Sequence, residues 1–164
     1  MIMEIELQRK LGAMIRAVKD ISNVIKTLDE YPTEINLVGG TPLNHAINRG
    51  RYEIVKYIVE RGANVNDLYD KNYSPLMSAV NGKNIEMVKL LLENGADVNL
   101  KDKYGNDALW KAVFNYNFEI VKLLVEAGAD PFKADSHENY SNYDGAKDLM
   151  PVTGEIINYF DSLK

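Results

Sequence analysis

The side chains that could do chemistry are few and scattered in this chain of 164 residues. Its two histidines, His45 and His137, stand far apart, and no third ligand recurs near either, so a metal site is not favoured. The chain has no cysteine, which excludes thiol nucleophiles, disulfides and cysteine zinc sites. Gly39 and Gly40 are not followed by the lysine of a phosphate-binding loop. We therefore expect no catalytic residues, no metal and no cofactor.

One enzymatic alternative rests on the C-terminal part of the chain, where His137, Asp144 and Asp148 could supply an acid and a base. These three residues do not complete a set of nucleophile, base and oxyanion donor. Acids that recur at a fixed spacing, such as Glu53 and Glu86, are better explained as structural charges near helix N-termini. The sequence favours a protein that is not an enzyme.

Composition and charge limit the classes of partner. The chain is 46% hydrophobic and 26% charged, as in an ordinary globular domain. Its 19 lysines and arginines are outnumbered by 24 acids, so its formal charge of −5 leaves no basic excess for nucleic acid phosphates. The start of the chain lacks the apolar run of a signal peptide, and no apolar stretch approaches the length of a membrane helix. We expect a cytoplasmic protein that binds neither nucleic acid nor membrane.

The sequence repeats itself with a period of 33 residues. The longer repeated segment starts at Glu53, Glu86 and Glu119, where it reads EIVKYIVERGANVN, EMVKLLLENGADVN and EIVKLLVEAGADPF. A shorter segment precedes each copy and reads TPLNHAI, SPLMSAV and DALWKAV. A fixed period of this length predicts stacked units, because one unit alone cannot bury its apolar face.

Each unit is predicted to contain two helices joined to the next unit by a polar turn. The first helix carries apolar residues spaced i, i+3 and i+4, as in Leu76, Ala79 and Val80, which gives it one buried face. The second helix ends at a glycine that can adopt a left-handed C-cap. The predicted N-caps of the first helices are Thr41, Ser74 and Asp107, and the predicted C-cap glycines are Gly62, Gly95 and Gly128.

These motifs resemble the ankyrin repeat, in the TPLxxA helix start, the second helix that ends in GADVN, and the turn between units. The resemblance implies an all-α solenoid of helix-turn-helix units with projecting β-turn fingers. We expect a single domain over residues 1–164, with three regular repeats at 39–71, 72–104 and 105–138. Degenerate capping repeats are expected at 1–38, where Val24 and Leu28 match the second-helix pattern, and at 139–164, where Pro151 and an insertion depart from it.

The family resemblance also implies where a partner would bind: on the finger tips and on the exposed face of the first helices. The informative residues are those that break the repeat pattern. The largest departures lie in the third repeat, where aromatic residues replace the usual polar ones. The predicted partner-binding residues are Leu68, Asp70, Lys71, Tyr73, Lys101, Lys103, Tyr104, Asn106, Trp110, Lys111, Phe114, Asn115 and Tyr140.

Two interpretations of the aromatic residues Trp110 and Phe114 stay open. They could form a binding centre, since large rigid aromatic side chains are enriched at interface hot spots, or they could pack against the next unit. Tyr73, Tyr104 and Tyr140 recur at nearly the repeat spacing and could form a stripe along the fingers. The finger charges nearly balance, because Lys101 and Lys103 offset Asp102 while Asp67 and Asp70 exceed Lys71. Strong electrostatic steering is therefore not expected.

The sequence therefore predicts a monomeric, non-catalytic module that recognises a protein or peptide. Two alternatives concern its role. The abundance of Asn, Lys, Ile and Tyr hints at a bacterial effector, delivered into a host cell by an intracellular bacterium, or at a toxin-neutralising immunity protein. An imperfect cap would instead leave apolar surface for a self-associating structural protein.

Overall fold

The computed structural model of the chain describes residues 13, 21–30, 42–134 and 140–164. Its helices confirm the predicted all-α solenoid. Among the described residues, the β-type pairing consists of one isolated antiparallel bridge between Tyr69 and Tyr73. The helices are α2 (Ile21–Glu30), α3 (Pro42–Asn48), α4 (Tyr52–Glu60), α5 (Pro75–Asn81), α6 (Ile85–Glu93), α7 (Ala108–Phe114), α8 (Phe118–Glu126), α9 (Asn142–Asp148) and α10 (Gly154–Asp161), with a 3₁₀ turn, η2 (Asp70–Asn72).

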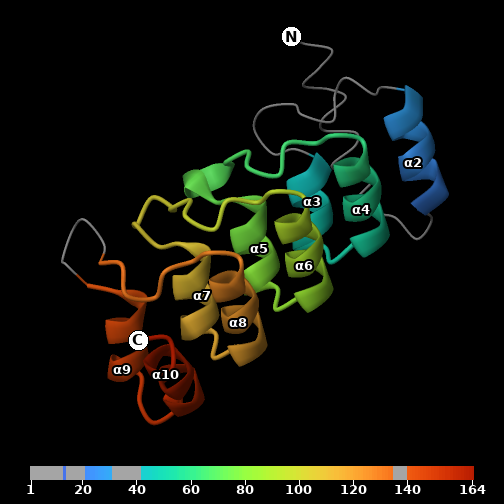
Figure 1. The fold of residues 1–164 in the computed structure, drawn as a ribbon. Helices are drawn as coiled ribbons and strands as arrows, with labels where there is room; N and C mark the ends of the chain where they lie inside the picture. The colour runs from blue at the N-terminus through green and yellow to red at the C-terminus, as the bar shows by residue number, and fades with distance from the viewer. Residues whose placement is uncertain (1–12, 14–20, 31–41, 135–139) are drawn as a thin grey trace.

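The helices form two rows, which Figure 1 shows as a stack of hairpins. The first helices α3, α5, α7 and α9 make one row, and each packs on the next. The second helices α4, α6, α8 and α10 make the other row, which α2 extends by packing on α4. The turns that join one hairpin to the next project beyond the row of first helices (Figure 1).

Side-chain caps begin the helices from α5 to α9. The Ser74 hydroxyl accepts a hydrogen bond from the amide of Met77 at 3.1 Å, and the Asp107 carboxylate accepts one from the amide of Trp110 at 2.7 Å, as predicted. The sequence prediction missed that Asn84 and Asn117 cap the second helices α6 and α8 in the same way. Thr41, the third predicted cap, lies outside the described residues.

The helix ends also follow the prediction. Gly62, Gly95 and Gly128 have φ of +84°, +82° and +98°, a left-handed conformation that a residue with a Cβ rarely adopts. Each glycine follows the last turn of a second helix and redirects the chain toward the next finger. The three positions therefore act as equivalent stops, which keeps the units in register.

The core repeats with the same period. Leu43, Leu76 and Leu109 are almost completely buried, as are the alanines three residues after each of them. The small alanines allow successive first helices to approach closely. The neighbouring units are also joined outside the core, because the Asn66 side chain donates to the carbonyl of Gly95 at 3.0 Å and accepts from the amide of Asp97 at 2.8 Å.

The terminal units continue the two rows. Val24 in α2 is fully buried, and Asp29 accepts hydrogen bonds from Tyr57 of α4 and from Arg61, which directly follows α4. At the other end Ala146 and Phe160 are fully buried, and the Ser141–Asp144 capping box starts α9. Of the expected N-terminal capping repeat, residues 1–12, 14–20 and 31–38 lie outside the described residues.

Candidate partner-binding surface

The residues with the strongest chemical potential are engaged in structural contacts. Asp144 closes the capping box with Ser141, and Asp148 accepts a hydrogen bond from the hydroxyl of Tyr140. His137, their proposed companion, lies outside the described residues. Within the described ranges, no group of three or more His, Asp or Glu side chains could hold a metal ion.

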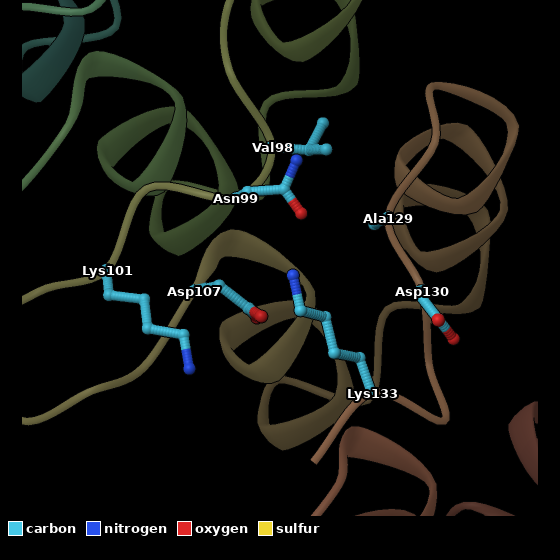
Figure 2. A pocket seen from close by; sticks show the side chains of 7 residues that line it. All are labelled: Val98, Asn99, Lys101, Asp107, Ala129, Asp130 and Lys133. Atoms are coloured by element: carbon cyan, nitrogen blue, oxygen red, sulfur yellow. The ribbon is translucent and has the colours of Figure 1, made fainter. Parts of the chain in front are cut away.

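One small pocket lies between the loops that follow α6 and α8 (Figure 2). Its volume is about 40 Å³, which suits one or two solvent molecules and not a substrate. Asp107 faces it, and burial raises the pKa of this carboxyl although hydrogen bonds from Trp110 and Asn142 oppose the shift. The pocket is lined by Val98, Asn99, Lys101, Asp107, Ala129, Asp130 and Lys133.

Two fingers project beside the first helices. Finger 1 (residues 68–73) is closed by the amide of Tyr69, which donates to the carbonyl of Tyr73 at 3.0 Å. Finger 2 (residues 101–106) is closed by the amide of Asp102, which donates to the carbonyl of Asn106 at 2.9 Å. The amide of Lys103 also donates to the carbonyl of Lys71 at 2.9 Å, so the two fingers form one continuous edge.

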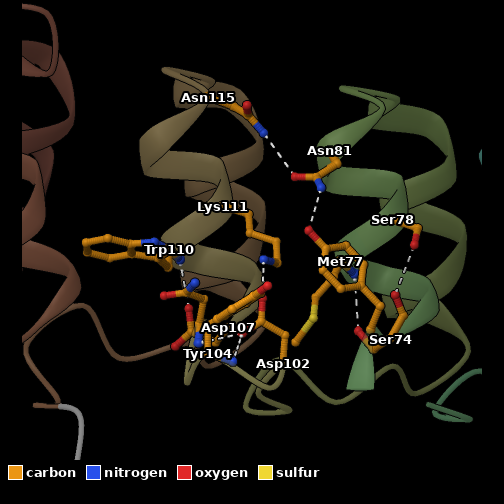
Figure 3. Close-up of polar contacts among 12 residues, drawn as sticks. Ser74, Met77, Ser78, Asn81, Asp102, Tyr104, Asp107, Trp110, Lys111 and Asn115 are labelled. Carbon is orange, nitrogen blue, oxygen red and sulfur yellow. Dashed lines mark hydrogen bonds and ion pairs between the residues drawn. The ribbon is translucent and has the colours of Figure 1, made fainter. Parts of the chain in front are cut away.

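Each finger is tied to the first helix that follows it by a side-chain pair at equivalent positions. In the second repeat the hydroxyls of Tyr69 and Ser78 share a hydrogen bond. In the third repeat Lys111 Nζ donates to Asp102 Oδ2 at 2.7 Å, and both side chains are buried. Figure 3 shows Lys111 reaching Asp102 from α7. The Lys111 ammonium also lies 4.4 Å from the ring centroid of Tyr73.

The Asp102 carboxylate is satisfied on every side. Its Oδ1 accepts from the amides of Tyr104 at 2.9 Å and Asn106 at 3.0 Å, while Oδ2 accepts from Lys111. Burial alone would raise the pKa of Asp102, but the Lys111 ammonium and the two amides lower it below its ordinary value. The same ion pair raises the pKa of Lys111 against its own burial. The pair is therefore charged at neutral pH.

A shallow groove of about 310 Å³ opens on the row of first helices, next to finger 2. It combines the aromatic rings of Trp110 and Phe114, whose centroids lie 6.0 Å apart, with three asparagine amides. The Asn115 amide lies 3.4 Å from the Asn81 carbonyl oxygen across α7 and α5 (Figure 3). The groove is lined by Asn81, Asn106, Trp110, Lys111, Phe114 and Asn115.

Trp110 packs against α9 at Gly145, which has no side chain. A Cβ built on Gly145 of α9 would lie 2.3 Å from Trp110 Cζ3, so the ring occupies the space that glycine leaves. The ring also meets Tyr140 at a centroid distance of 6.2 Å. Trp110 is thus half-buried against α9, whereas Phe114, 55% exposed, is the more accessible of the two rings.

The other predicted partner-binding residues divide by exposure. Leu68, Asp70, Lys71, Lys101, Lys103 and Tyr104 are exposed on fingers 1 and 2, and Tyr73, Asn106, Asn115 and Tyr140 are half-buried. Lys111 is buried and holds Asp102, so its observed role is to fix finger 2. The expected tyrosine stripe is replaced by separate contacts: Tyr73 meets Tyr69, Tyr104 lies beside Lys103, and Tyr140 meets Trp110.

Sequence reasoning missed Asn81 as a groove residue, because Asn48 stands at the same position one repeat earlier and Asn81 therefore does not break the pattern. It also missed the ion pair of Asp102 with Lys111. A signal for that pair exists in the sequence, since the two positions change together relative to Tyr69 and Ser78 one repeat earlier. When two positions nine residues apart both change from one repeat to the next, the joint change indicates that the two side chains are in contact. Neither residue type indicates this contact when it is considered alone.

Stacked helix hairpins with fingers and a groove on one row define a repeat solenoid whose recognition surface is external. Two family models agree with this class: one described as ankyrin repeats in three copies matches residues 66–135, and one described as an ankyrin repeat matches residues 38–67. The chain belongs to the ankyrin repeat family, whose members are generally protein–protein interaction modules and typically non-catalytic. A comparison with curated proteins gave no match. Among the helices of the described residues, none is long and apolar enough to cross a membrane.

Proposed function

We propose that this chain binds a protein segment or peptide in the groove of the third repeat, with Phe114 and Trp110 as its apolar anchor points. The observation that carries the proposal is the pairing of an exposed aromatic ring with a groove on a rigid surface. Phe114 is 55% exposed although it belongs to a helix whose other apolar residues, except the half-buried Trp110, are buried. Aromatic anchors of this kind supply large contact area at low entropic cost.

The polar groups of the groove support a peptide occupant. Asn81, Asn106 and Asn115 present amides that can donate to and accept from a peptide backbone. Lys111 is committed to Asp102, so it contributes a fixed wall and not a mobile cation. Because helices α5 and α7 and finger 2 already hold these groups in place, binding would cost little conformational entropy.

The test is a selection of random dodecapeptides displayed on phage against the immobilised full chain, followed by calorimetric titration of a selected peptide. Phe114→Ala should weaken binding about tenfold or more, because it removes the exposed anchor. Leu163→Ala is the matched control: Leu163 is 43% exposed on the C-terminal unit, outside the groove, and its loss should leave affinity unchanged. Equal affinities for wild type and Phe114→Ala would contradict the proposal.

Self-association is a second candidate, favoured by one observation. Met150, Val152 and Leu163 of the C-terminal unit are 55%, 63% and 43% exposed, which is unusual for large apolar side chains. Sedimentation velocity of the full chain tests it. We expect a monomer that stays monomeric in a Val152→Ser variant, and a concentration-dependent dimer in the wild type alone would favour self-association instead.

A further inference from the structure

Charge is distributed unevenly between the two rows of helices. The second helices α4, α6 and α8 each carry two glutamates and one lysine. The first helices α3, α5 and α7 contain neither aspartate nor glutamate, whereas α9, the last helix of that row, contains Asp144 and Asp148. Although the chain has a formal charge of −5, the two helices that line the groove, α5 and α7, carry no acid.

The turns from first to second helices carry positive charge. Residues 49–51, 82–84 and 115–117 carry Arg49, Arg51 and Lys83 and no acid. Lys83 is exposed and stands two residues beyond the groove residue Asn81. One end of the groove is therefore adjacent to a cation and to no carboxylate from these turns.

Finger 2, at the other end of the groove, is more positive than its sequence indicates. The three charges of this finger are Lys101, Asp102 and Lys103. The two lysines are exposed, whereas Asp102 is buried and its charge is compensated by Lys111. Asp107 lies beside Lys101 but is half-buried and accepts from Trp110 and Asn142. The expected charge balance is thereby corrected for finger 2, since the acid that offset its lysines is not at the surface, whereas finger 1 still exposes both Asp70 and Lys71.

Resting on the proposed function, we propose that the partner segment is an acidic peptide with one apolar side chain. The apolar side chain lies against Phe114 and Trp110, and flanking carboxylates face Lys103 on finger 2 and Lys83 beyond α5. Complementary charge of this kind adds selectivity and speeds association, and it repels the basic segments that a neutral groove would accept.

The experiment compares two double variants that remove the same charge. Lys83→Gln with Lys103→Gln neutralises the cations at the ends of the groove. Lys56→Gln with Lys89→Gln is the control, because those lysines lie on the second helices beside Glu60 and Glu86 and are 48% and 42% exposed. The probes are the peptides selected from the dodecapeptide library, their charge-neutral versions with Gln for each acid, and a single-stranded thymidine oligonucleotide. Binding is followed by the fluorescence of Trp110, which is the single tryptophan of the chain.

We expect the selected peptides to carry net negative charge, to bind more weakly as salt is added, and to lose about five- to tenfold in affinity in the Lys83 and Lys103 variant alone. Selected peptides that are neutral or basic, or an equal loss in both double variants, would overturn this inference. If Phe114→Ala still abolishes binding in either of these cases, the proposed groove site stands and only the acidic character of the partner is refuted. The failure of this inference can thus be distinguished from the failure of the proposed function. Displacement of the peptide by the oligonucleotide would also overturn it, because the surface would then bind polyanions in general.

Discussion

Finger 1 is joined to α5, and finger 2 to α7, at equivalent positions of the repeat. The two connections have the same backbone arrangement but use different side-chain chemistry. Tyr69 and Ser78 share a neutral hydrogen bond, whereas the equivalent Asp102 and Lys111 form a buried ion pair at 2.7 Å. The same two positions are therefore in contact in both repeats, although the residue types at those positions differ. The ionic version holds finger 2 through one carboxylate that also accepts two finger amides. The third repeat is consequently the one in which the surface departs furthest from the pattern.

The largest effect we expect comes from breaking the ionic tie. Lys111→Met leaves the Asp102 carboxylate buried without its cation, which should lower the free energy of unfolding by about 3 kcal/mol. Ser78→Ala removes the neutral tie of the second repeat and should cost about 1 kcal/mol. Urea denaturation followed by circular dichroism measures both. Equal losses in the two variants would show that the ties are energetically equivalent.

The next largest effect concerns the space under Trp110. Gly145→Ala places a Cβ against the ring at 2.3 Å, so the ring or α9 must move, and we expect a loss of about 2 kcal/mol with a shifted Trp110 emission. Gly82→Ala in the second repeat is the control: its Cβ would meet only backbone oxygens at 3.4 and 3.5 Å, so its cost should be within about 0.5 kcal/mol. An unchanged stability and spectrum in Gly145→Ala would refute the packing of Trp110 on α9.

A smaller effect is expected at the junction between the first and second repeats. Asn66→Ala removes the two hydrogen bonds to Gly95 and Asp97 in the following loop and should cost about 1 kcal/mol. The equivalent Asn99 donates its side chain to Asp97 within its own loop at 3.3 Å, so Asn99→Ala should cost less than about 0.5 kcal/mol. Thermal unfolding of the pair measures the difference, and the reverse order would contradict this account of the junction.

The smallest expected effect is a pH dependence. The pKa of Asp102 is lowered in the folded chain, so its contribution to stability is present above the ordinary aspartate pKa and is lost as the pH falls through the folded value. Unfolding free energies measured from pH 6 to pH 2 should therefore fall less steeply in Asp102→Asn than in the wild type. Parallel curves would mean that Asp102 is not stabilised as a carboxylate.

The sequence was sufficient to predict what the period repeats. The N-caps Ser74 and Asp107 and the helix C-terminus at Gly95 depend only on the residue type at each position and on its immediate neighbours in the chain. The packing of Trp110 against the next unit was one of the two interpretations left open by the sequence, and the choice between them depends on Gly145, which lies in the unit where the period slips. The burial of Lys111 was missed for a related reason: a charged side chain on an exposed helix position is normally solvated, and only its partner Asp102 keeps it inside.

The sequence pointed to some of the residues that line the groove and not to others. Phe114 and Trp110 were identified because they break the pattern, while Asn81 escaped notice because it conforms to it. A groove between repeats is built from both kinds of residue, since one wall comes from the regular second repeat and the other from the divergent third. Residues that depart from the repeat pattern therefore indicate where such a groove lies, but they do not identify all the residues that line it.

The most direct test of the central claim, that the third repeat carries the binding groove, is a chemical-shift map of the full chain labelled with nitrogen-15 and titrated with a selected dodecapeptide. We predict that the largest shifts occur at the side-chain amides of Asn81, Asn106 and Asn115 and at the indole of Trp110. Shifts confined to the second helices or to the C-terminal unit, with these four signals unmoved, would contradict the account.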